Sequence, residues 1–324
     1  MSDREAAHFL ATVPLLEGWA EADLAALARV LRRRTVREGE VLWRQGDAAR
    51  EALFVVDGAV SISLQLPADR TVEIGRAGPG QLLGEIALLD GQGHTMSVHV
   101  AETATVLALG RLDFADLLAG RHPAAFVLKR RLAALLTGRL RDQLRYLAGS
   151  LGGGPPAPPG RDAASSLADL EPCPPPDSRY VRRMATFHDF DPLALWGFLT
   201  SGAYVRCPPG RTLVAEGTPS AAYCLTINGA VEKVLVRGDR RIRVGLAGPG
   251  KAFGYESLID GGPSPLAAVS RERAVLLVIP HDVFDQLYRR EDAVGRVFVD
   301  AIQRDLLVTV RQTLRPYARL ASSV

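Results

Sequence analysis

Short apolar segments alternate with glycine, aspartate and proline between Thr35 and Leu109. The clearest candidates for strands are residues 42–43, 53–56, 60–64, 71–75 and 105–109. Many short strands separated by glycine turns are typical of a jelly roll or a β-barrel. We therefore expect this region to fold as a mainly β domain rather than as a parallel sheet.

Helical spacing of apolar residues occurs on both sides of these strands. Leucines recur at intervals of three and four residues over residues 5–34, and helices are also predicted over 112–119 and 124–147. The arginines at 32–34 are interpreted as the solvated end of the first helix, with a phosphate-binding patch as the alternative. The predicted domain is thus a jelly roll flanked by helices, within the α+β class.

The same pattern occurs a second time along the chain. Gly39, Gly46 and Gly58 recur 171 residues later as Gly210, Gly217 and Gly229, and the tetrapeptide Ala-Gly-Pro-Gly at 77–80 returns at 247–250. A shared register over this length indicates two copies of one domain, with a period too long for a solenoid repeat. The second copy is expected to have strands between residues 204 and 279 and helices over 184–199, 282–288 and 292–314.

A segment rich in proline and glycine separates the two copies. Residues 148–179 contain a Gly-Gly-Gly run and several Pro-Pro pairs. Such a segment cannot form a core, and it is expected to be stiff where proline dominates and flexible where glycine and serine dominate. We therefore divide the chain into copy one (residues 5–147), a linker (148–179) and copy two (180–320).

The last helix of each copy carries a long stripe of apolar residues. The stripe consists of Leu128, Leu132, Leu136, Leu140 and Leu144 in copy one, and of Phe298, Ile302, Leu306, Val310 and Leu314 in copy two. Each stripe is expected either to pack on its own domain or to form a helix-to-helix interface between copies or between chains. In the second case a protein partner or a homodimer would bind through the helices over 124–147 and 292–318.

Charge and hydropathy exclude several classes of protein. The 39 Lys and Arg residues nearly balance the 36 Asp and Glu residues, and a net charge of +3 gives little support for nucleic-acid binding. No window approaches the ~18 consecutive apolar residues of a membrane span. The N-terminus, Met-Ser-Asp-Arg-Glu, lacks the basic start and apolar run of a secretory signal. We expect a cytoplasmic protein without a membrane span.

Motifs for catalysis or metal binding are missing from the sequence. The three cysteines form no C-x-x-C pair, the six histidines form no H-x-H, and no G-x-S-x-G segment is present. We therefore expect neither an enzyme nor a metal site. The alternative, a cupin-type metal or haem site, would need His94 and His99 to converge with a third ligand.

The glycine pattern, the order helix, jelly roll, helix, and the segment Gly-Gln-Leu-Leu-Gly-Glu-Ile-Ala-Leu-Leu at 80–89 together resemble the cyclic-nucleotide-binding domain. This domain occurs in the catabolite activator/FNR regulators, the protein kinase A regulatory subunit and gated channels. The resemblance covers about residues 9–145 and 184–318. It implies that cAMP, cGMP or another cyclic nucleotide is the effector.

The family's binding segment, here called the cassette, is a short loop and helix inserted between strands. The resemblance implies that its small residues let the backbone approach the cyclic phosphate, which is bound by N–H groups and neutralised by an arginine. A glutamate accepts a hydrogen bond from the ribose hydroxyl. The residues of each copy at these positions therefore decide whether it binds an effector.

Copy one keeps part of the cassette. Its expected ligand-binding residues are Gly84, Glu85, Ile86, Ala87, His94, Thr95 and Met96. Gly84 and Glu85 match the family's glycine and glutamate, whereas His94 stands where the family has its arginine. A charge-assisted hydrogen bond contributes roughly 1.5–3 kcal/mol, so the missing arginine should weaken a cyclic nucleotide about 10- to 100-fold.

Copy two departs further from the family. The equivalent positions are Gly254, Tyr255, Glu256, Ser257, Ser264 and Pro265. Tyr255 replaces the glutamate and Ser264 replaces the arginine, so neither the ribose acceptor nor the phosphate counter-charge is present. Lys251 is interpreted either as a surface residue or as a source of positive charge. We expect copy two to be a non-binding, structural version of the domain.

Together these features predict a non-enzymatic sensor or adaptor. An effector bound in copy one would reposition the C-terminal helix and change the contacts with a partner. The alternative is that both domains are degenerate and serve only protein–protein assembly.

No direct DNA binding is expected, because no helix-turn-helix follows either copy. The letters Arg-Arg-Met-Ala at 182–185 fit the inhibitor segment of kinase regulatory subunits, but that segment precedes both domains in the family.

The histidine at the arginine position leads to a prediction about pH. A free histidine has a pKa of about 6.5, so protonation of His94 would restore one positive charge beside a cyclic phosphate. Cyclic-nucleotide affinity should therefore rise as the pH falls below about 6.5. Calorimetric titration at two pH values, one well below and one well above this value, measures the effect, and equal affinities would contradict it.

Overall fold

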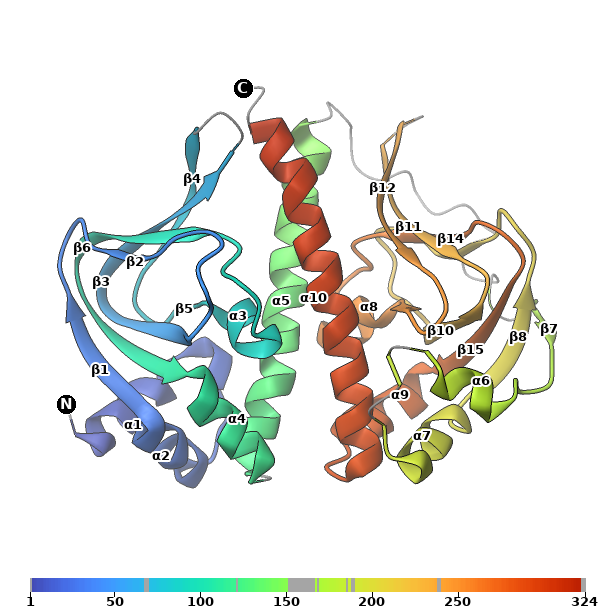
Figure 1. The fold of residues 1–324 in the computed structure, drawn as a ribbon, viewed down its shortest axis with the longest axis horizontal. Helices are drawn as coiled ribbons and strands as arrows, with labels where there is room; N and C mark the ends of the chain where they lie inside the picture. The colour runs from blue at the N-terminus through green and yellow to red at the C-terminus, as the bar shows by residue number, and fades with distance from the viewer. Residues whose placement is uncertain are drawn as a thin grey trace. The chain divides into compact units, whose positions relative to one another are not determined.

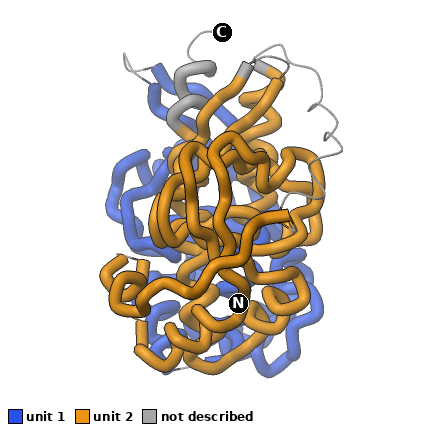
Figure 2. Tube along the Cα trace, turned by 90° about the vertical axis from the view of Figure 1, so that its right-hand side faces the viewer, with its two compact units in different colours: residues 1–135, 318–324 blue, residues 136–317 orange. Residues whose placement is uncertain are grey.

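A computed structural model describes residues 2–66, 70–120, 122–150, 167, 169–184, 186–187, 190–237 and 240–321. It separates into two compact units: unit 1 comprises residues 1–135 and 318–324, and unit 2 comprises residues 136–317 (Figure 2). The division falls inside a single helix, α5 (Pro123–Ser150). Of the predicted linker, residues 151–166 and 168 lie outside the described residues, whereas Leu170 is buried in a core cluster of copy two and Glu171–Pro172 pairs with Val205–Arg206, so the expectation that the segment forms no part of a core is wrong at this end.

Copy one contains an antiparallel sheet with helices before and after it (Figure 1). The strands are β1 (Leu31–Val36), β2 (Val41–Trp43), β3 (Glu51–Gln65), β4 (Thr71–Ala77), β5 (Leu82–Leu83) and β6 (Ser97–Gly110). The helices are α1 (Asp3–Ala11), α2 (Glu21–Val30), α3 (Glu85–Asp90), α4 (Arg111–Ala119) and α5, with a 3-10 turn at Pro14–Leu16. The strands pair in the order β1-β6-β3-β4, with β2 on β6 and β5 on β3. The jelly-roll prediction is confirmed, although the described strands do not close into a barrel.

Copy two repeats this order in two sheets. Its strands are β7 (Glu171–Pro172), β8 (Ala203–Cys207), β9 (Thr212–Val214), β10 (Ala222–Asn228), β11 (Val231–Arg237), β12 (Arg240–Ala247), β13 (Ala252–Phe253), β14 (Ala267–Ser270) and β15 (Ala274–Pro280). They pair in the orders β13-β10-β15-β8-β7 and β12-β11-β14-β9. The helices are α6 (Ser178–Arg182), α7 (Pro192–Leu199), α8 (Tyr255–Asp260), α9 (His281–Arg289) and α10 (Ala293–Ala321). The short helix α8 therefore occupies the same place in copy two as α3 in copy one.

The strand registers allow single residues of the two copies to be aligned. In copy one, Ile62 of β3 lies opposite Gly75 of β4, and the register shifts directly after Ile62. In copy two, Lys233 of β11 lies opposite Gly245 of β12, and the register shifts directly after Lys233. Ile62 and Lys233 are therefore equivalent positions, and copy two carries a charge where copy one carries an aliphatic side chain.

Apolar burial holds the helices of copy one to its sheet. Leu10 of α1, Leu27 of α2 and Leu132 of α5 pack in one cluster with Phe54 and Leu109 of the strands. Each of these side chains is at most 2% exposed. Burying a side chain of this size contributes roughly 1.5–3 kcal/mol, so the terminal helices are integral parts of the domain.

The prediction of one helical region over residues 5–34 is wrong at its C-terminal end. The chain leaves α2 at Val30 and enters β1 at Leu31, so the arginines at 32–34 lie in a strand rather than at the end of a helix. Their backbone pairs with residues 106–108 of β6, a long-range contact that local sequence does not encode. Arg32 and Arg34 form ion pairs with Asp113 and Glu51, which favours a structural role over a phosphate-binding patch.

The helix predicted over residues 184–199 is shorter than expected. Among the described residues of this range, only Pro192–Leu199 is helical, and residues 185, 188 and 189 lie outside the described part. Asp191 caps this helix by accepting hydrogen bonds from the backbone N–H groups of Leu193 and Ala194. A residue before proline also avoids the helical conformation, so the Asp191-Pro192 pair marks the start of α7.

The two apolar stripes of the terminal helices are buried within the chain. Leu128, Leu132, Leu136, Leu140 and Leu144 are at most 2% exposed, and Phe298, Ile302, Leu306 and Val310 are fully buried. In unit 2, the second half of α5 is fixed by Arg141, which binds Asp260 at the end of α8, and by Gln143, which accepts a hydrogen bond from Thr313 of α10. Binding of a partner or a second copy through these helices stays a prediction.

Gly58→Ala should destabilise copy one far more than Gly39→Ala. Both glycines have a φ angle of +80°, but a Cβ at Gly58 would lie 2.4 Å from the carbonyl oxygen of Thr103, whereas a Cβ at Gly39 would meet nothing within 4 Å. The left-handed conformation alone costs roughly 1–2 kcal/mol, which is the loss expected for Gly39→Ala. Urea unfolding of the full chain measures both changes, and similar losses would contradict the close approach at Gly58.

Candidate functional site

The cassette of copy one begins at a glycine that lies directly against the sheet. Gly84 has a φ angle of +80°, and a Cβ there would lie 2.9 Å from the carbonyl oxygen of Glu51 and 3.5 Å from Cη2 of Trp43. The left-handed conformation and this lack of space both require glycine. The backbone of Gly84 therefore reaches the inner side of β3, next to the edge of the Trp43 ring.

His94 is fixed to the turn that contains Gly46. The N–H group of Gly46 donates to the carbonyl of His94 at 2.8 Å, and the N–H group of His94 donates to the carbonyl of Asp47 at 2.9 Å. The imidazole stacks on the indole of Trp43, with ring centroids 4.3 Å apart and planes 9° apart. Only 6% of His94 is exposed, so its ring is part of the interior.

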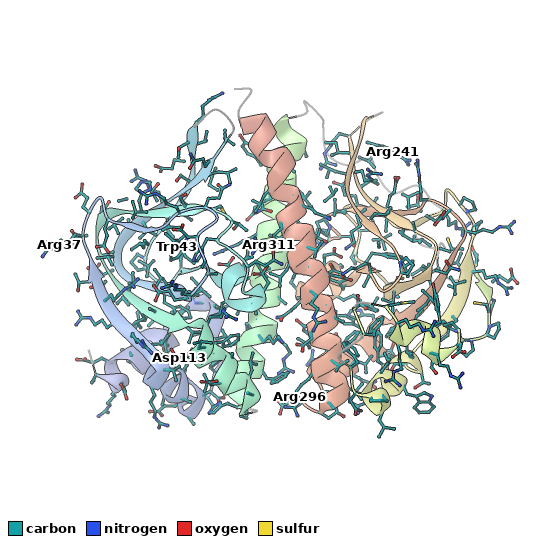
Figure 3. The ribbon with its side chains drawn as sticks, in the orientation of Figure 1. Arg37, Trp43, Asp113, Arg241, Arg296 and Arg311 are labelled. Carbon is teal, nitrogen blue, oxygen red and sulfur yellow. The ribbon has the colours of Figure 1, made fainter. Side chains whose placement is uncertain are left out.

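The structure thus brings Gly84 and His94 together through Trp43, which sequence reasoning missed as a site residue. Trp43 is 7% exposed and lies on the inner side of the strands of copy one (Figure 3). Only a comparison of the two copies could have indicated Trp43 from the sequence, because the equivalent residue of copy two is Val214. The stacked pair therefore exists in one copy alone.

The other predicted residues of copy one lie near Gly84, Trp43 and His94. Glu85 opens α3 and is 2% exposed, and Ile86 beside it is 5% exposed. Thr95 and Met96 are half-buried and lead into β6. The side chain of Ala87 lies outside the described part of the structure. The short helix and the loop that carries His94 therefore enclose one region against β2 and β3.

Copy two keeps the same backbone geometry with different side chains. A Cβ at Gly254 would lie 2.8 Å from the carbonyl oxygen of Ala222 and 3.5 Å from Val214, which reproduces the surroundings of Gly84. Ser264 makes the backbone hydrogen bonds that His94 makes in copy one, with Gly217 and Thr218. The predicted cassette positions therefore align, and the copies differ in what their side chains supply.

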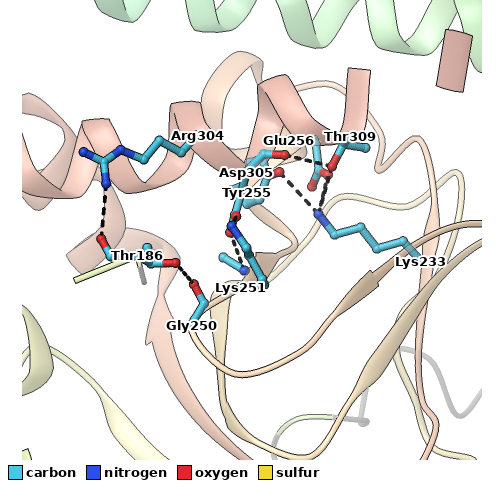
Figure 4. Close-up of polar contacts among 10 residues, drawn as sticks. Thr186, Lys233, Gly250, Lys251, Tyr255, Glu256, Arg304, Asp305 and Thr309 are labelled. Carbon is cyan, nitrogen blue, oxygen red and sulfur yellow. Dashed lines mark hydrogen bonds and ion pairs between the residues drawn. The ribbon is translucent and has the colours of Figure 1, made fainter. Parts of the chain in front are cut away.

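Tyr255 and Ser257 of the copy-two cassette make polar contacts within the protein. Tyr255 is fully buried, and its hydroxyl lies 3.3 Å from Nζ of Lys233 (Figure 4). Burial, followed by the neighbouring carboxylate of Glu256, raises the pKa of Tyr255 well above its usual value, so the hydroxyl stays protonated. The hydroxyl of Ser257 accepts a hydrogen bond from the N–H group of Ser220 at 3.0 Å.

The remaining predicted residues of copy two supply no charge. Ser264 and Pro265 are both buried, and the Ser264 hydroxyl has no hydrogen-bond partner among the described residues. Lys251, which was open between a surface residue and a source of charge, forms an ion pair of 3.0 Å with Asp305 of α10. The Lys251 side chain is 40% exposed, so Lys251 is a surface residue whose ammonium pairs with the buried carboxylate of Asp305.

Metal sites and membrane spans are two further features considered for the described residues. Within the described residues, no group of three or more His, Cys, Asp and Glu side chains is placed to hold a metal ion. None of the helices searched in that part of the chain is long and apolar enough to cross a membrane.

Replacing the stacked rings by the copy-two residues tests whether Trp43 and His94 act as a pair. Trp43→Val and His94→Ser should each destabilise copy one, and the double variant should lose less than the sum of the two. Stacked aromatic pairs are coupled by roughly 0.5–1.5 kcal/mol beyond their burial. A double-mutant cycle by urea unfolding measures this coupling, and strict additivity would contradict the stacking.

Curated relatives match parts of this chain. A cyclic nucleotide-gated potassium channel of Mesorhizobium japonicum is 37% identical over 107 residues, which are 33% of this chain and 28% of the channel. The cyclic AMP receptor protein of Thermus thermophilus is 31% identical over 40% of this chain and 58% of its own length. The type II regulatory subunit of the cAMP-dependent protein kinase of Drosophila melanogaster is 32% identical over 39% and 32%, respectively. The match thus spans less than two thirds of each relative.

Solved structures also share features with the chain. A cyclic nucleotide-binding domain from Methylobacillus flagellatus has a TM-score of 0.40 and 21% identity, over 43% of this chain and 79% of that one. The regulatory domain of Toxoplasma gondii PKA with cAMP has a TM-score of 0.33 and 15% identity, over 91% and 94%. The family model for the cyclic nucleotide-binding domain matches residues 33–121 and 204–291, more than half of the chain, which confirms the resemblance. The chain therefore belongs to the cyclic nucleotide-binding domain family and contains two such domains in tandem.

Proposed function

We propose that the chain is a non-enzymatic regulatory protein whose first domain binds a cyclic nucleotide or a related small anion. The observation that carries this proposal is the difference between the two cassettes. Copy one keeps Gly84 against the sheet and a buried carboxylate, Glu85, at the next position. Copy two has the same backbone but fills the carboxylate position with the ring of Tyr255. An effector is therefore assigned to copy one and a structural role to copy two.

The chemistry of copy one favours a weak and selective site. A carboxylate at the first position of α3 is an acceptor suited to a ribose hydroxyl. The position of the family's arginine holds a neutral or singly charged imidazole, which donates fewer hydrogen bonds than a guanidinium. Affinity for the phosphate is therefore lower than in a domain with the arginine, and recognition depends more on the nucleoside part.

The relay to a partner runs through α5 in this proposal. The first half of α5 packs into the core of copy one, where Leu128 and Leu132 contact the cluster around Phe54. A ligand that shifts α3 against this cluster would also shift α5, because packed interiors respond as discrete arrangements rather than by continuous deformation. The proposed partner is a protein that senses the position of this helix.

One observation favours the alternative, in which both domains serve only assembly. His94 does not lie open at the cassette but stacks on Trp43 with 6% of its surface exposed. A ring used for packing is less available to a phosphate. The two functions therefore differ in whether any nucleotide binds to copy one.

Titration of the full chain with cAMP, cGMP and cyclic dinucleotides separates these functions. Ligand at 100 times its Kd should raise the free energy of unfolding by about 2.7 kcal/mol, seen as a thermal shift. Glu85→Gln should abolish most of this shift, and His94→Arg should tighten binding about 10- to 100-fold.

Tyr255→Phe, in copy two, is the matched control and should leave binding unchanged. If neither the wild type nor His94→Arg responds to any nucleotide, the assembly function is correct and copy one is not a sensor. If the response is lost in Tyr255→Phe but kept in Glu85→Gln, the binding site lies in copy two instead.

A further inference from the structure

Copy two contains a group of polar side chains where a jelly roll normally holds apolar ones. This group, here called the polar cluster, consists of Lys233, Lys251, Tyr255, Glu256, Asp305 and Thr309 (Figure 4). All except Lys251 are at most 6% exposed. They come from three elements, the sheet, the cassette and α10, so the cluster joins parts that are distant in the sequence.

Lys233 is the centre of the cluster. Its Nζ lies 3.3 Å from the hydroxyl of Tyr255, 3.3 Å from the hydroxyl of Thr309 and 3.9 Å from the carboxylate of Glu256. The ammonium also lies 5.0 Å from the centre of the Tyr255 ring, a cation–π distance. One buried charge therefore connects β11 to α8 and to α10.

Asp305 makes a second connection between α10 and the cassette. One carboxylate oxygen accepts a hydrogen bond of 2.6 Å from the N–H group of Ala252 in β13, and the other lies 3.0 Å from Nζ of Lys251. Burial raises the pKa of Asp305, and the charges of Lys233 and Lys251 oppose that change. The carboxylate is thus held by groups that all belong to the cassette or the sheet.

A third connection lies next to the second. The hydroxyl of Thr186 donates to the carbonyl of Gly250 at 2.8 Å, and Arg304 of α10 donates to the carbonyl of Thr186 at 3.5 Å. The loop before β13 is therefore linked to α10 through Thr186. Two consecutive residues of α10, Arg304 and Asp305, therefore attach this helix to the cassette and the loop before it.

The equivalent positions of copy one show what copy two has gained. Strand register places Ile62 where copy two has Lys233. The helices α3 and α8 have the same length, and the second residue of each is Ile86 in copy one and Glu256 in copy two. An aliphatic pair is thus replaced by a pair of opposite charges, which avoids an uncompensated buried charge.

We propose that the polar cluster takes the place of a ligand in copy two and fastens α10 to the cassette without any effector. Tyr255 fills the position of the ribose-binding carboxylate, and Lys233 and Asp305 supply the bonds between cassette and helix that a bound molecule would otherwise provide. Buried ion pairs add little to net stability, since desolvation offsets their attraction, so the cluster acts on the position of α10. Copy two then needs no ligand to hold α10 against the cassette, whether or not copy one binds a nucleotide.

Hydrogen exchange of the full chain without nucleotide tests this proposal. The double variant Lys233→Ile/Glu256→Ile installs the copy-one residues at both positions and leaves no unpaired charge of this pair. We expect amides over residues 302–314 to exchange at least about tenfold faster in this variant, while those of β10 and β15 keep their protection. Unchanged exchange of α10 in a folded double variant would overturn the proposal.

Thr309→Val keeps the proposal testable if the double variant does not fold. It removes one hydroxyl bound by Lys233 and leaves every charge in place, and Thr313→Val makes the same change one turn later, outside the cluster. Faster exchange at 302–309 in Thr309→Val alone supports the cluster, and equal effects of both variants contradict it. Because none of these measurements needs nucleotide binding, failure of the copy-one sensor would not affect them.

Discussion

Each copy of this domain depends on one close approach of backbone to backbone. Gly84 lies against the carbonyl oxygen of Glu51, and Gly254 lies against that of Ala222, at positions where a Cβ would be only 2.9 or 2.8 Å away. This contact fixes the point where the cassette leaves the sheet, and therefore which side chains face the interior. Because both copies share it, their difference in chemistry has to come from side chains alone.

Those side chains place the charge in different parts of the two interiors. Copy one has a carboxylate, Glu85, at the start of its cassette helix and a stacked aromatic pair beside it, Trp43 and His94. In copy two the aromatic pair is absent, and the charge sits on Lys233 and its partners between the sheet and α10. The same fold thus accommodates a buried carboxylate beside an aromatic pair in one copy and a buried ammonium with its partners in the other.

The sequence was sufficient for the repeat and the family, because glycines with positive φ angles are required by the backbone and recur in register. It was insufficient where long-range contacts decide the outcome. The arginines at 32–34 join a strand only because β6 pairs with them, and the stacking of Trp43 on His94 joins residues 51 positions apart in the sequence. Lys233 is buried against Thr309 of α10, 76 residues later along the chain, and local sequence does not encode such a contact.

The polar cluster is better explained by specificity than by stability. Copy one shows that the same two positions accept Ile62 and Ile86, so the fold itself does not require charges there. Aliphatic side chains pack against any apolar surface, whereas an ammonium held by two hydroxyls and a carboxylate accepts few arrangements of its neighbours. A displaced α10 would leave Lys233 and Asp305 buried without their partners, which is far more costly than moving an apolar contact. The charges therefore restrict where this helix can lie, which is the property that the proposal for copy two requires.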